Sequence, residues 1–366
     1  MHAAKTGSGT VMVVGARGIP DVEGGAEKNA EMLFPLVAAA GYRVVLLGLE
    51  GVLTRDSYRG VELRSVPNRR ILKTDKIFYY LNAILMAWKM RPDIVHLQGL
   101  GASLFLWAYK LMGARVVVRY GSADYVVSKW GVIGRIGFQL AEYQTRFADA
   151  VIAVAPALAL RLKGNGIARN VHVIANALDV VPAAAVLPPP GKWEDGIPFV
   201  LVVGRVTAQK NIHAIVEGFR LFRDQGGTRY RLLIAGGLDD QSYVDPLRLN
   251  LGEDVVLLGR CSRKRLEGLY RRCALFVNGS MHEGCSNAVL EAISRDCPII
   301  LSGIAENRDF GLDERLYFDP KDPRSIAGTM SAALADPASY RADRSTFLSW
   351  PTVGEKTLAI YRSISN

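Results

Sequence analysis

The sequence predicts an α/β protein of two domains, each a doubly wound parallel sheet, which face each other across a cleft. Its 366 residues, 49% of them hydrophobic, are too many for one ordinary domain and suit two. Short apolar runs alternate with helical patterns, and this alternation occurs twice, on either side of a proline-rich stretch at 179–198. We therefore expect a first domain at 1–182, a linker at 183–197 and a second domain at 198–349. A C-terminal helix at 350–366 is expected to pack back on the first domain.

Strands of the first domain are expected where apolar residues stand at consecutive positions, as in strands buried on both faces of a parallel sheet. They fall at 11–15, 43–48, 61–66, 93–97, 114–119, 150–154 and 171–175. Amphipathic patterns between them predict helices at 26–39, 76–90 and 134–147.

The second domain repeats the alternation. Strands are expected at 199–204, 230–237, 254–260, 274–279 and 298–303, with helices at 213–223, 263–270 and 287–295. Ligands of open parallel sheets bind beyond the carboxyl ends of the strands. The cleft between these two Rossmann-like domains is therefore the expected binding site.

The net charge of +10 points to an anionic partner such as nucleic acid, a membrane surface or a phosphorylated substrate. The excess lies in residues 1–185, which hold 22 Lys and Arg against 13 Asp and Glu; residues 186–366 hold 23 against 22. No basic run with interleaved aromatic residues resembles a nucleic-acid-binding module, so we do not expect nucleic acid as a partner.

The spacing of the cysteines and the length of the apolar runs argue against a zinc or dithiol site and against an integral membrane protein. Cys261, Cys273, Cys285 and Cys297 lack the short CxxC spacing of a zinc or dithiol site, and we expect free thiols in a reducing cytoplasm. The first ten residues are polar, so we expect no signal peptide there. The most apolar segment, 77–88, is shorter than the roughly 20 residues that a membrane span needs, so no integral membrane segment is expected.

A glycine-rich loop follows the first expected strand, with Gly15, Gly18, Gly24 and Gly25 before a helix that begins near Ala26. Glycines let a backbone approach a ligand closely, and the first amides of a helix favour an anion. The spacing is not the GxGxxG fingerprint of dinucleotide binding. On its own, the glycine-rich loop is compatible with a phosphate-binding loop and with an ordinary turn.

Two basic residues, Arg205 and Lys210, stand in VGRVTAQKN, where the first strand of the second domain enters a helix. Arginine chelates phosphate through two N–H groups, and lysine supplies a point charge. The residues alone are equally compatible with a diphosphate site and with two solvated side chains.

Two carboxylates bracket a helix start in HEGCSNAVLEA. Glu283 lies in the loop, Ser286 is a candidate N-cap, and Glu291 lies one turn inside the helix among apolar neighbours. A carboxylate in that position must be paired or bound to a ligand. The pattern suits a ligand with hydroxyl groups and a phosphate; a capping carboxylate with a structural salt bridge is the alternative.

Taken in order, these motifs resemble those of the retaining nucleotide-sugar glycosyltransferases of the GT-B fold, family 4. GGAE, VGR…QKN, AGG, LGR, HEGCSNAVLEA and PII follow the family's order over about residues 11–335. The first half, with RGIP…GGAE, YRGVELRSVP and ADAVIAV, is similar to a bacterial rhamnosyltransferase-like subgroup.

The resemblance implies that the second domain binds a nucleotide sugar and that the first takes the acceptor. Arg205 and Lys210 would bind the donor diphosphate and offset charge on the leaving nucleotide. Glu283 would contact the donor sugar, and Glu291 would hold the ribose hydroxyls. The remaining implied donor contacts are Gly24, Gly25, Gly236, Gly237, Gly259, Arg260, Cys261, Gly284, Cys285, Ser286 and Asn287.

The chain departs from the family at Tyr120, where many relatives carry His or Asp before a glycine. A neutral phenol cannot do the same electrostatic work, so the role of Tyr120 as a candidate catalytic residue is left undecided by the sequence.

No general base is predicted, because in the retaining enzymes that this chain resembles the departing phosphate is thought to take the acceptor proton. Asp239 and Asp240 are expected to be structural or solvated, and we expect no metal and no other cofactor. His96 suits either the acceptor cleft or the core.

The sequence thus predicts a retaining hexosyltransferase of bacterial surface polysaccharide synthesis, whether exopolysaccharide or lipopolysaccharide. The donor would be a GDP-, UDP- or dTDP-linked sugar, and the acceptor a polyprenyl-diphosphate-linked saccharide. A nucleotide-sugar epimerase of the same fold and a non-catalytic scaffold are the alternatives. Residues 69–91 mix bases with aromatic residues, as either a membrane-surface helix or a sheet-packed helix would. We expect a cytoplasmic protein held peripherally on the inner face of the plasma membrane by anionic lipid.

Overall fold

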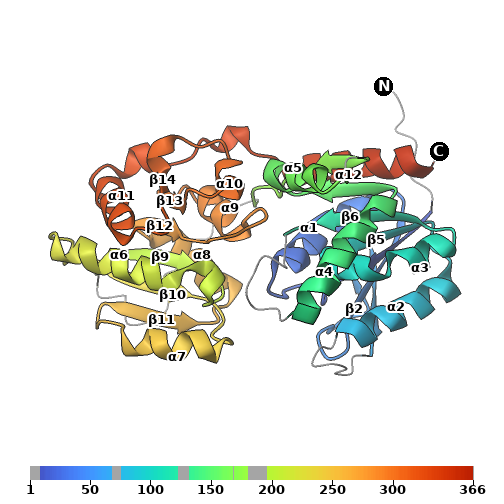
Figure 1. Ribbon diagram of the computed structural model, residues 1–366, viewed down its shortest axis with the longest axis horizontal. Coiled ribbons are helices and arrows are strands. Elements are labelled where there is room, and N and C mark those ends of the chain that lie inside the picture. The colour runs from blue at the N-terminus through green and yellow to red at the C-terminus, as the bar shows by residue number, and fades with distance from the viewer. Residues whose placement is uncertain (1–8, 68–75, 123–131, 168, 180–195, 366) are drawn as a thin grey trace. The chain divides into compact units, whose positions relative to one another are not determined.

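The computed structural model describes residues 9–67, 76–122, 132–167, 169–179 and 196–365 (Figure 1). The chain divides into two compact units, residues 1–177 with 348–366 and residues 178–347. Each unit has its own sheet and its own buried core. The linker expected at 183–197 lies outside the described residues except for its last two positions.

Unit 1 is built on a sheet with the strand order β3-β4-β2-β1-β5-β6-β7-β8. All neighbours are parallel except β3 and β4. The strands are β1 (Thr10–Val14), β2 (Arg43–Leu49), β3 (Ser57–Tyr58), β4 (Val61–Val66), β5 (Ile94–Gln98), β6 (Arg115–Tyr120), β7 (Ala150–Ala153) and β8 (Val171–Val173). The helices are α1 (Gly25–Ala39), α2 (Lys76–Met90), α3 (Leu106–Leu111), α4 (Val132–Gln144), α5 (Pro156–Gly164) and α12 (Trp350–Ser365), with the 3₁₀ segments η1 (Leu100–Phe105) and η3 (Thr145–Phe147).

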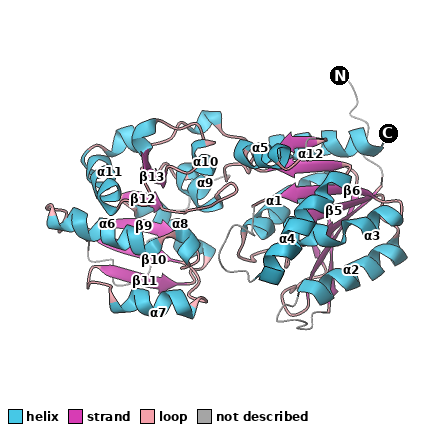
Figure 2. Cartoon of the chain, viewed as in Figure 1, coloured by secondary structure: helices cyan, strands magenta, loops and turns pink. Residues whose placement is uncertain are grey.

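Helices cover both faces of this sheet (Figures 1 and 2). Helices α1 and α12 pack on one face, where Phe34 and Tyr361 join a buried cluster with Val11 and Val44 of the strands. The connections through α2, α3 and α4 run in the opposite direction along the sheet from that through α1. Since parallel crossovers are right-handed, these three helices lie on the other face.

Unit 2 is built on a parallel sheet with the order β11-β10-β9-β12-β13-β14. The strands are β9 (Phe199–Val203), β10 (Arg231–Ala235), β11 (Val255–Gly259), β12 (Leu275–Asn278), β13 (Ile299–Ser302) and β14 (Tyr317–Phe318). The helices are α6 (Ile212–Asp224), α7 (Gln241–Leu249), α8 (Arg263–Arg272), α9 (Asn287–Ser294), α10 (Ala305–Arg308) and α11 (Pro323–Ala335); shorter 3₁₀ turns are η5 (Ala208–Lys210), η6 (Glu314–Leu316), η7 (Pro337–Tyr340) and η8 (Arg344–Thr346).

The predicted fold class is confirmed: both units are α/β with parallel, doubly wound sheets. In unit 2 the strand order reverses between β9 and β12, since β9 pairs with β10 on one side and with β12 on the other. Ligands of such sheets bind at the carboxyl ends of the strands beside this switch point. The loops that follow β9 and β12 are therefore where a site is expected.

Candidate active site

Lys210 and Arg205 come from the loop after β9. The strand ends at Val203, Arg205 is exposed, and Lys210 closes the turn η5 just before α6. Among the described residues Arg205 forms no ion pair, so its guanidinium is open to solvent. The side-chain amide of Asn211, the next residue, donates to the Pro320 carbonyl over 2.7 Å and anchors this turn.

Glu283 lies in the loop after β12, and its carboxylate forms an ion pair with Lys210. The Ser280 hydroxyl donates to the same oxygen over 2.7 Å and the Asn278 amide over 3.4 Å. Only 10% of the Glu283 side chain is exposed. Burial by itself would raise the pKa of Glu283, but the Lys210 charge and these hydrogen bonds outweigh it and lower the pKa. The site thus holds a buried, ionised carboxylate beside a lysine.

A second layer of polar residues, which sequence analysis did not identify, supports the Glu283 loop. The Asn307 amide donates to the Ser302 hydroxyl over 2.9 Å, and that hydroxyl donates to the Ser280 carbonyl over 2.6 Å. Asn278 and Ser302 are the last residues of β12 and β13. In the sequence, both residues could have been found as single polar residues at the end of an otherwise apolar strand.

Three glycines bring the loops of β9, β10 and β11 together at the same edge. The amide of Gly204 donates to Ala235 over 2.9 Å, and the amide of Gly236 donates to Gly259 over 2.9 Å. A Cβ on Gly236 would collide with the Gly204 carbonyl. Gly236 therefore permits a backbone contact that no side chain would allow, whereas a Cβ on Gly259 would meet nothing within 4 Å.

Gly236→Ala is expected to lower the free energy of unfolding by about 2 kcal/mol, because the new methyl group must displace the Gly204 backbone. A urea titration measures this. Gly252→Ala is the matched control, since a Cβ there meets nothing within 4 Å, and it is expected to stay within about 0.5 kcal/mol of the wild type. Equal stability of the two variants would contradict the close-packing argument.

The loop after β11 presents Arg260 and Cys261. The Arg260 guanidinium pairs with Asp239 over 2.7 Å, and both side chains are more than half exposed. The Cys261 thiol points to the Gly259 carbonyl at 3.7 Å, and all four cysteines are free. Asp239 was expected to be structural or solvated, and it forms an exposed ion pair with an arginine.

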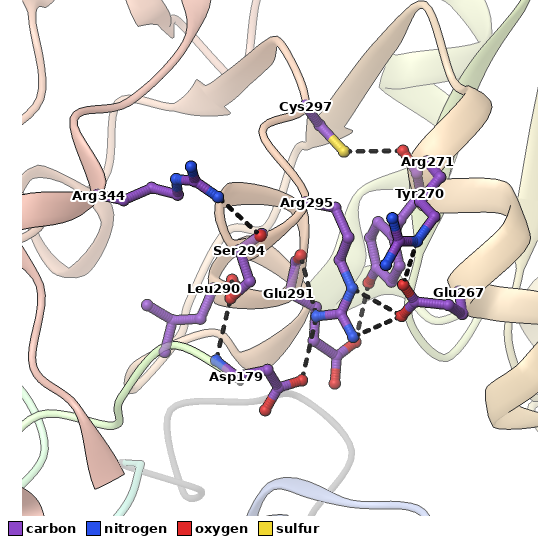
Figure 3. Close-up of polar contacts among 10 residues, drawn as sticks. All are labelled: Asp179, Glu267, Tyr270, Arg271, Leu290, Glu291, Ser294, Arg295, Cys297 and Arg344. Carbon is purple, nitrogen blue, oxygen red and sulfur yellow. Dashed lines mark hydrogen bonds and ion pairs between the residues drawn. The ribbon is translucent and has the colours of Figure 1, made fainter. Parts of the chain in front are cut away.

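Glu291 lies on α9, inside a polar cluster that ties this helix to α8 (Figure 3). The Tyr270 hydroxyl donates to the Glu291 carboxylate over 3.0 Å. Burial and the Glu291 charge raise the pKa of Tyr270. The carboxylate is therefore paired, as the apolar neighbours on this helix required. Gly284, Cys285, Ser286 and Asn287 lead from Glu283 into the start of this helix.

Arg295 joins the cluster to the chain that enters unit 2. Its guanidinium pairs with Glu267 over 2.7 Å and with Asp179 over 3.1 Å, and it donates to the Glu291 carbonyl over 3.2 Å. All three ionised side chains are less than one-fifth exposed. No local sequence pattern predicts this network, because Arg295 and Asp179 are distant in the chain.

The remaining predicted site residues belong to unit 1. Gly24 precedes α1, and a Cβ there would collide with the Glu27 carboxylate, which pairs with Arg17 over 2.9 Å. Gly25 is the first residue of α1. Tyr120 is fully buried, and its hydroxyl donates to Glu142. The catalytic role of Tyr120 stays a prediction, and its side chain has no exposed surface here.

Of the two positions expected for His96, the acceptor cleft or the core, the structure shows the core. Its ring is fully buried, Nδ1 lies 2.6 Å from the Tyr361 hydroxyl, and Phe34 packs edge-on against it. Burial, followed by the Arg119 charge, lowers the pKa of His96 to about 3, so the imidazole is neutral at physiological pH.

The described residues contain neither a candidate membrane span nor a candidate metal cluster. None of their helices combines the length and apolar character that a membrane span requires. Within the same ranges, no three His, Cys, Asp or Glu side chains gather as metal ligands do.

Family models match both units: Glycosyltransferase Family 4 matches residues 23–181, and Glycosyl transferases group 1 matches residues 187–346. The serotype-specific mannosyltransferase WbdA of Escherichia coli is 29% identical over 148 residues, which cover 39% of this chain and 18% of that protein. The matches span less than half the length of the first curated relatives compared.

Solved structures share the fold over nearly the whole chain. Sucrose-phosphate synthase from Thermosynechococcus elongatus has a TM-score of 0.76 at 19% identity and covers 97% of this chain and 98% of its own. Anabaena Alr3699/HepE, crystallised with UDP and glucose, has a TM-score of 0.75 at 16% identity and covers 97% of this chain and 100% of its own. Each unit therefore matches a glycosyltransferase family model, and the chain as a whole has the GT-B fold.

Proposed function

We propose that this chain transfers a hexose from a nucleotide sugar to a saccharide acceptor in bacterial surface polysaccharide synthesis, with retention of the anomeric configuration. The observation that carries the proposal is the Lys210–Glu283 ion pair beside the exposed Arg205, at the switch point of unit 2. The similarity to WbdA, named a mannosyltransferase, and to HepE, crystallised with UDP and glucose, supports the substrate class.

In this proposal, Arg205 and Lys210 bind the donor diphosphate and offset the negative charge that develops as the nucleotide leaves. The ionised Glu283 orients Lys210 and accepts hydrogen bonds from hydroxyls of the donor sugar. Glu291 takes the ribose hydroxyls, and the glycine edge at Gly236 and Gly259 lets the donor lie close to the backbone. The leaving phosphate accepts the proton from the acceptor hydroxyl, so no side chain has to act as the base.

The proposed acceptor is a polyprenyl-diphosphate-linked saccharide at the inner face of the plasma membrane. The proposed donor is a GDP-, UDP- or dTDP-linked sugar, and the proposal includes neither a metal nor a cofactor. The positive charge of residues 1–185 suits an acceptor that carries phosphate on an anionic surface. The rhamnosyltransferase-like specificity stays a prediction.

A donor panel tests the proposal. Purified protein is incubated with GDP-, UDP- and dTDP-sugars with and without acceptor, and NMR follows donor loss and product configuration. We expect one donor class to be consumed and the product to keep the donor's anomeric configuration. Glu291→Ala is expected to raise KM for that donor at least tenfold, because a bidentate hydroxyl contact is lost.

Three outcomes would contradict the proposal. An epimer formed from donor alone would identify an epimerase. Inversion at the anomeric carbon would exclude the retaining mechanism. Absence of both donor consumption and thermal stabilisation by any nucleoside diphosphate would indicate a non-catalytic scaffold.

A further inference from the structure

Unit 1 exposes an unusual concentration of large apolar side chains. Among the described residues, thirteen such side chains are exposed, and ten of them lie on α2, α3, α4 and the adjoining turn η3. We name this set the α2–α4 face; its members are Leu81, Leu85, Trp88, Trp107, Leu111, Val132, Ile136, Leu140, Tyr143 and Phe147. Scattered apolar residues are normal on a surface, but a contiguous set marks an interaction site.

The exposed residues recur at helical spacing. On α4 and η3 they stand at 132, 136, 140, 143 and 147, which places them in one stripe along the outside. On α2 they stand at 81, 85 and 88, while Tyr79, Ala83 and Ala87 of the same helix are buried. Each of these helices therefore has an apolar outer face in addition to its core face. Exposed apolar residues on a helix that already packs other residues on the core mark a surface for a partner or a lipid bilayer.

The helices adjoin one another, so the stripes form one surface. Helix α2 packs against α3, η1 packs against α4, and α3 packs against η3. Tyr80 of α2 and Phe105 of η1 lie with ring centroids 5.9 Å apart. Figure 1 shows α2, α3 and α4 on the same side of the sheet of unit 1.

The exposed charges on these elements have one sign. Lys76, Lys89, Arg135 and Arg146 are exposed, and Lys110 pairs with Asp149 over 2.7 Å. The described residues of α2, η1, α3, α4 and η3 include a single acidic residue, Glu142, and it is buried. No carboxylate of these elements therefore faces solvent.

Cations also stack on the aromatic rings of this surface. The Arg146 guanidinium lies 3.7 Å from the centre of the Tyr143 ring, and that of Arg91 lies 5.9 Å from the centre of the Trp88 ring. Trp and Tyr beside Arg and Lys are the residues that settle at the boundary between lipid headgroups and acyl chains.

We propose that the α2–α4 face docks on the surface of an anionic lipid bilayer. The apolar side chains enter the headgroup boundary, and the bases meet the lipid phosphates, each contributing through the negative surface potential. A bilayer suits this surface better than a protein partner, because the apolar residues spread over three helices and the charge has one sign. The docking follows from the surface alone, whereas its purpose, access to a lipid-linked acceptor, rests on the proposed function.

Vesicle flotation tests the docking. The full chain is mixed with vesicles of phosphatidylcholine, with and without phosphatidylglycerol, at low and high salt. We expect binding to the phosphatidylglycerol vesicles that weakens as salt rises. Ile136→Glu with Leu140→Glu is expected to reduce that binding at least tenfold, since two apolar contacts become charged. Leu249→Glu is the matched control: this leucine is 87% exposed on α7, and the substitution should leave binding unchanged.

A second variant pair, Lys89→Gln with Arg135→Gln, tests the charge contribution without touching the apolar stripe. It is expected to remove most of the preference for phosphatidylglycerol. Binding that ignores salt and lipid charge, or equal binding by the Ile136→Glu, Leu140→Glu protein, would overturn the proposal. So would an oligomer in light scattering that this variant dissociates while no vesicles bind, because the face would then join two copies of the chain.

Donor turnover separates this proposal from the proposed function. With a water-soluble acceptor, the Ile136→Glu, Leu140→Glu protein is expected to turn over donor like the wild type. If the wild type turns over donor but does not bind vesicles, the docking proposal is wrong and the proposed function is retained. If the wild type binds vesicles but turns over no donor, the proposed function is wrong and the docking proposal is retained.

Discussion

Lys210→Ala is expected to reduce kcat for sugar transfer by about 10²- to 10³-fold while the protein stays folded. The Lys210 ammonium is paired with Glu283 at the end of β9, where the proposal places the leaving diphosphate. Removal of one group that stabilises developing charge has an effect of this size. Steady-state kinetics with a saturating donor measures it, and Lys264→Ala, an exposed lysine on α8, is the control.

The same variant changes how stability depends on pH. Because the folded protein holds the pKa of Glu283 below its ordinary value of 4.5, the ion pair contributes stability above that pH. This contribution is lost as pH falls below about 4.5 and the carboxylate takes up its proton. Without Lys210 the pKa of Glu283 rises, so this part of the acid-induced loss disappears. Near-normal turnover by a folded Lys210→Ala protein would refute the site assignment.

Arg295→Met is expected to lower the free energy of unfolding by about 3 kcal/mol. The substitution leaves Asp179 without its arginine and removes one of the two arginines of Glu267, and both carboxylates are largely buried. Breaking a buried ion pair from one side costs this much because a charge stays desolvated. For a unit of this size the melting temperature should fall by about 2–4 °C for each kcal/mol. Urea titration and calorimetry measure the change.

Arg341→Met provides the control for that experiment. Arg341 pairs with Asp296 over 2.6 Å, but both side chains are nearly half exposed, so we expect less than about 1 kcal/mol. Adding Asp179→Asn to Arg295→Met should recover part of the loss, because the largely buried carboxylate that faced the arginine is then neutral. Glu267 keeps its ion pair with Arg271 and is left unchanged. Equal losses for Arg295→Met and Arg341→Met would show that burial of the network contributes nothing.

Much of the fold could be predicted because its strands are buried on both faces and therefore form unbroken apolar runs. The expected strands at 43–48 and 61–66 correspond to β2 and β4 almost residue for residue. Several helices were not foreseen. Helix α7 is nine residues long and contains Pro246, and α11 is rich in alanine and small polar residues, so neither was recognised as a helix from the sequence.

The site could be predicted in part, for a physical reason. Lys210 and Glu283 follow neighbouring strands at the switch point, and local motifs mark both ends. The Arg295–Asp179 pair joins residues that no local pattern relates. The helix pattern at 134–147 predicted α4 and η3, but exposure depends on which neighbours cover a face, and the apolar stripe there could not be distinguished from a core stripe.

Helix α12 has a consequence for the order in which the chain is made. It completes unit 1 by burying Trp350 and Tyr361 against α1 and by the hydrogen bond between the Tyr361 hydroxyl and the His96 ring. Unit 2 is contiguous at 178–347, so every residue of it leaves the ribosome before α12 does. Domains usually fold in the order of synthesis. Here the unit that starts the chain finishes its core last, and until then the apolar face of α1 needs protection from aggregation.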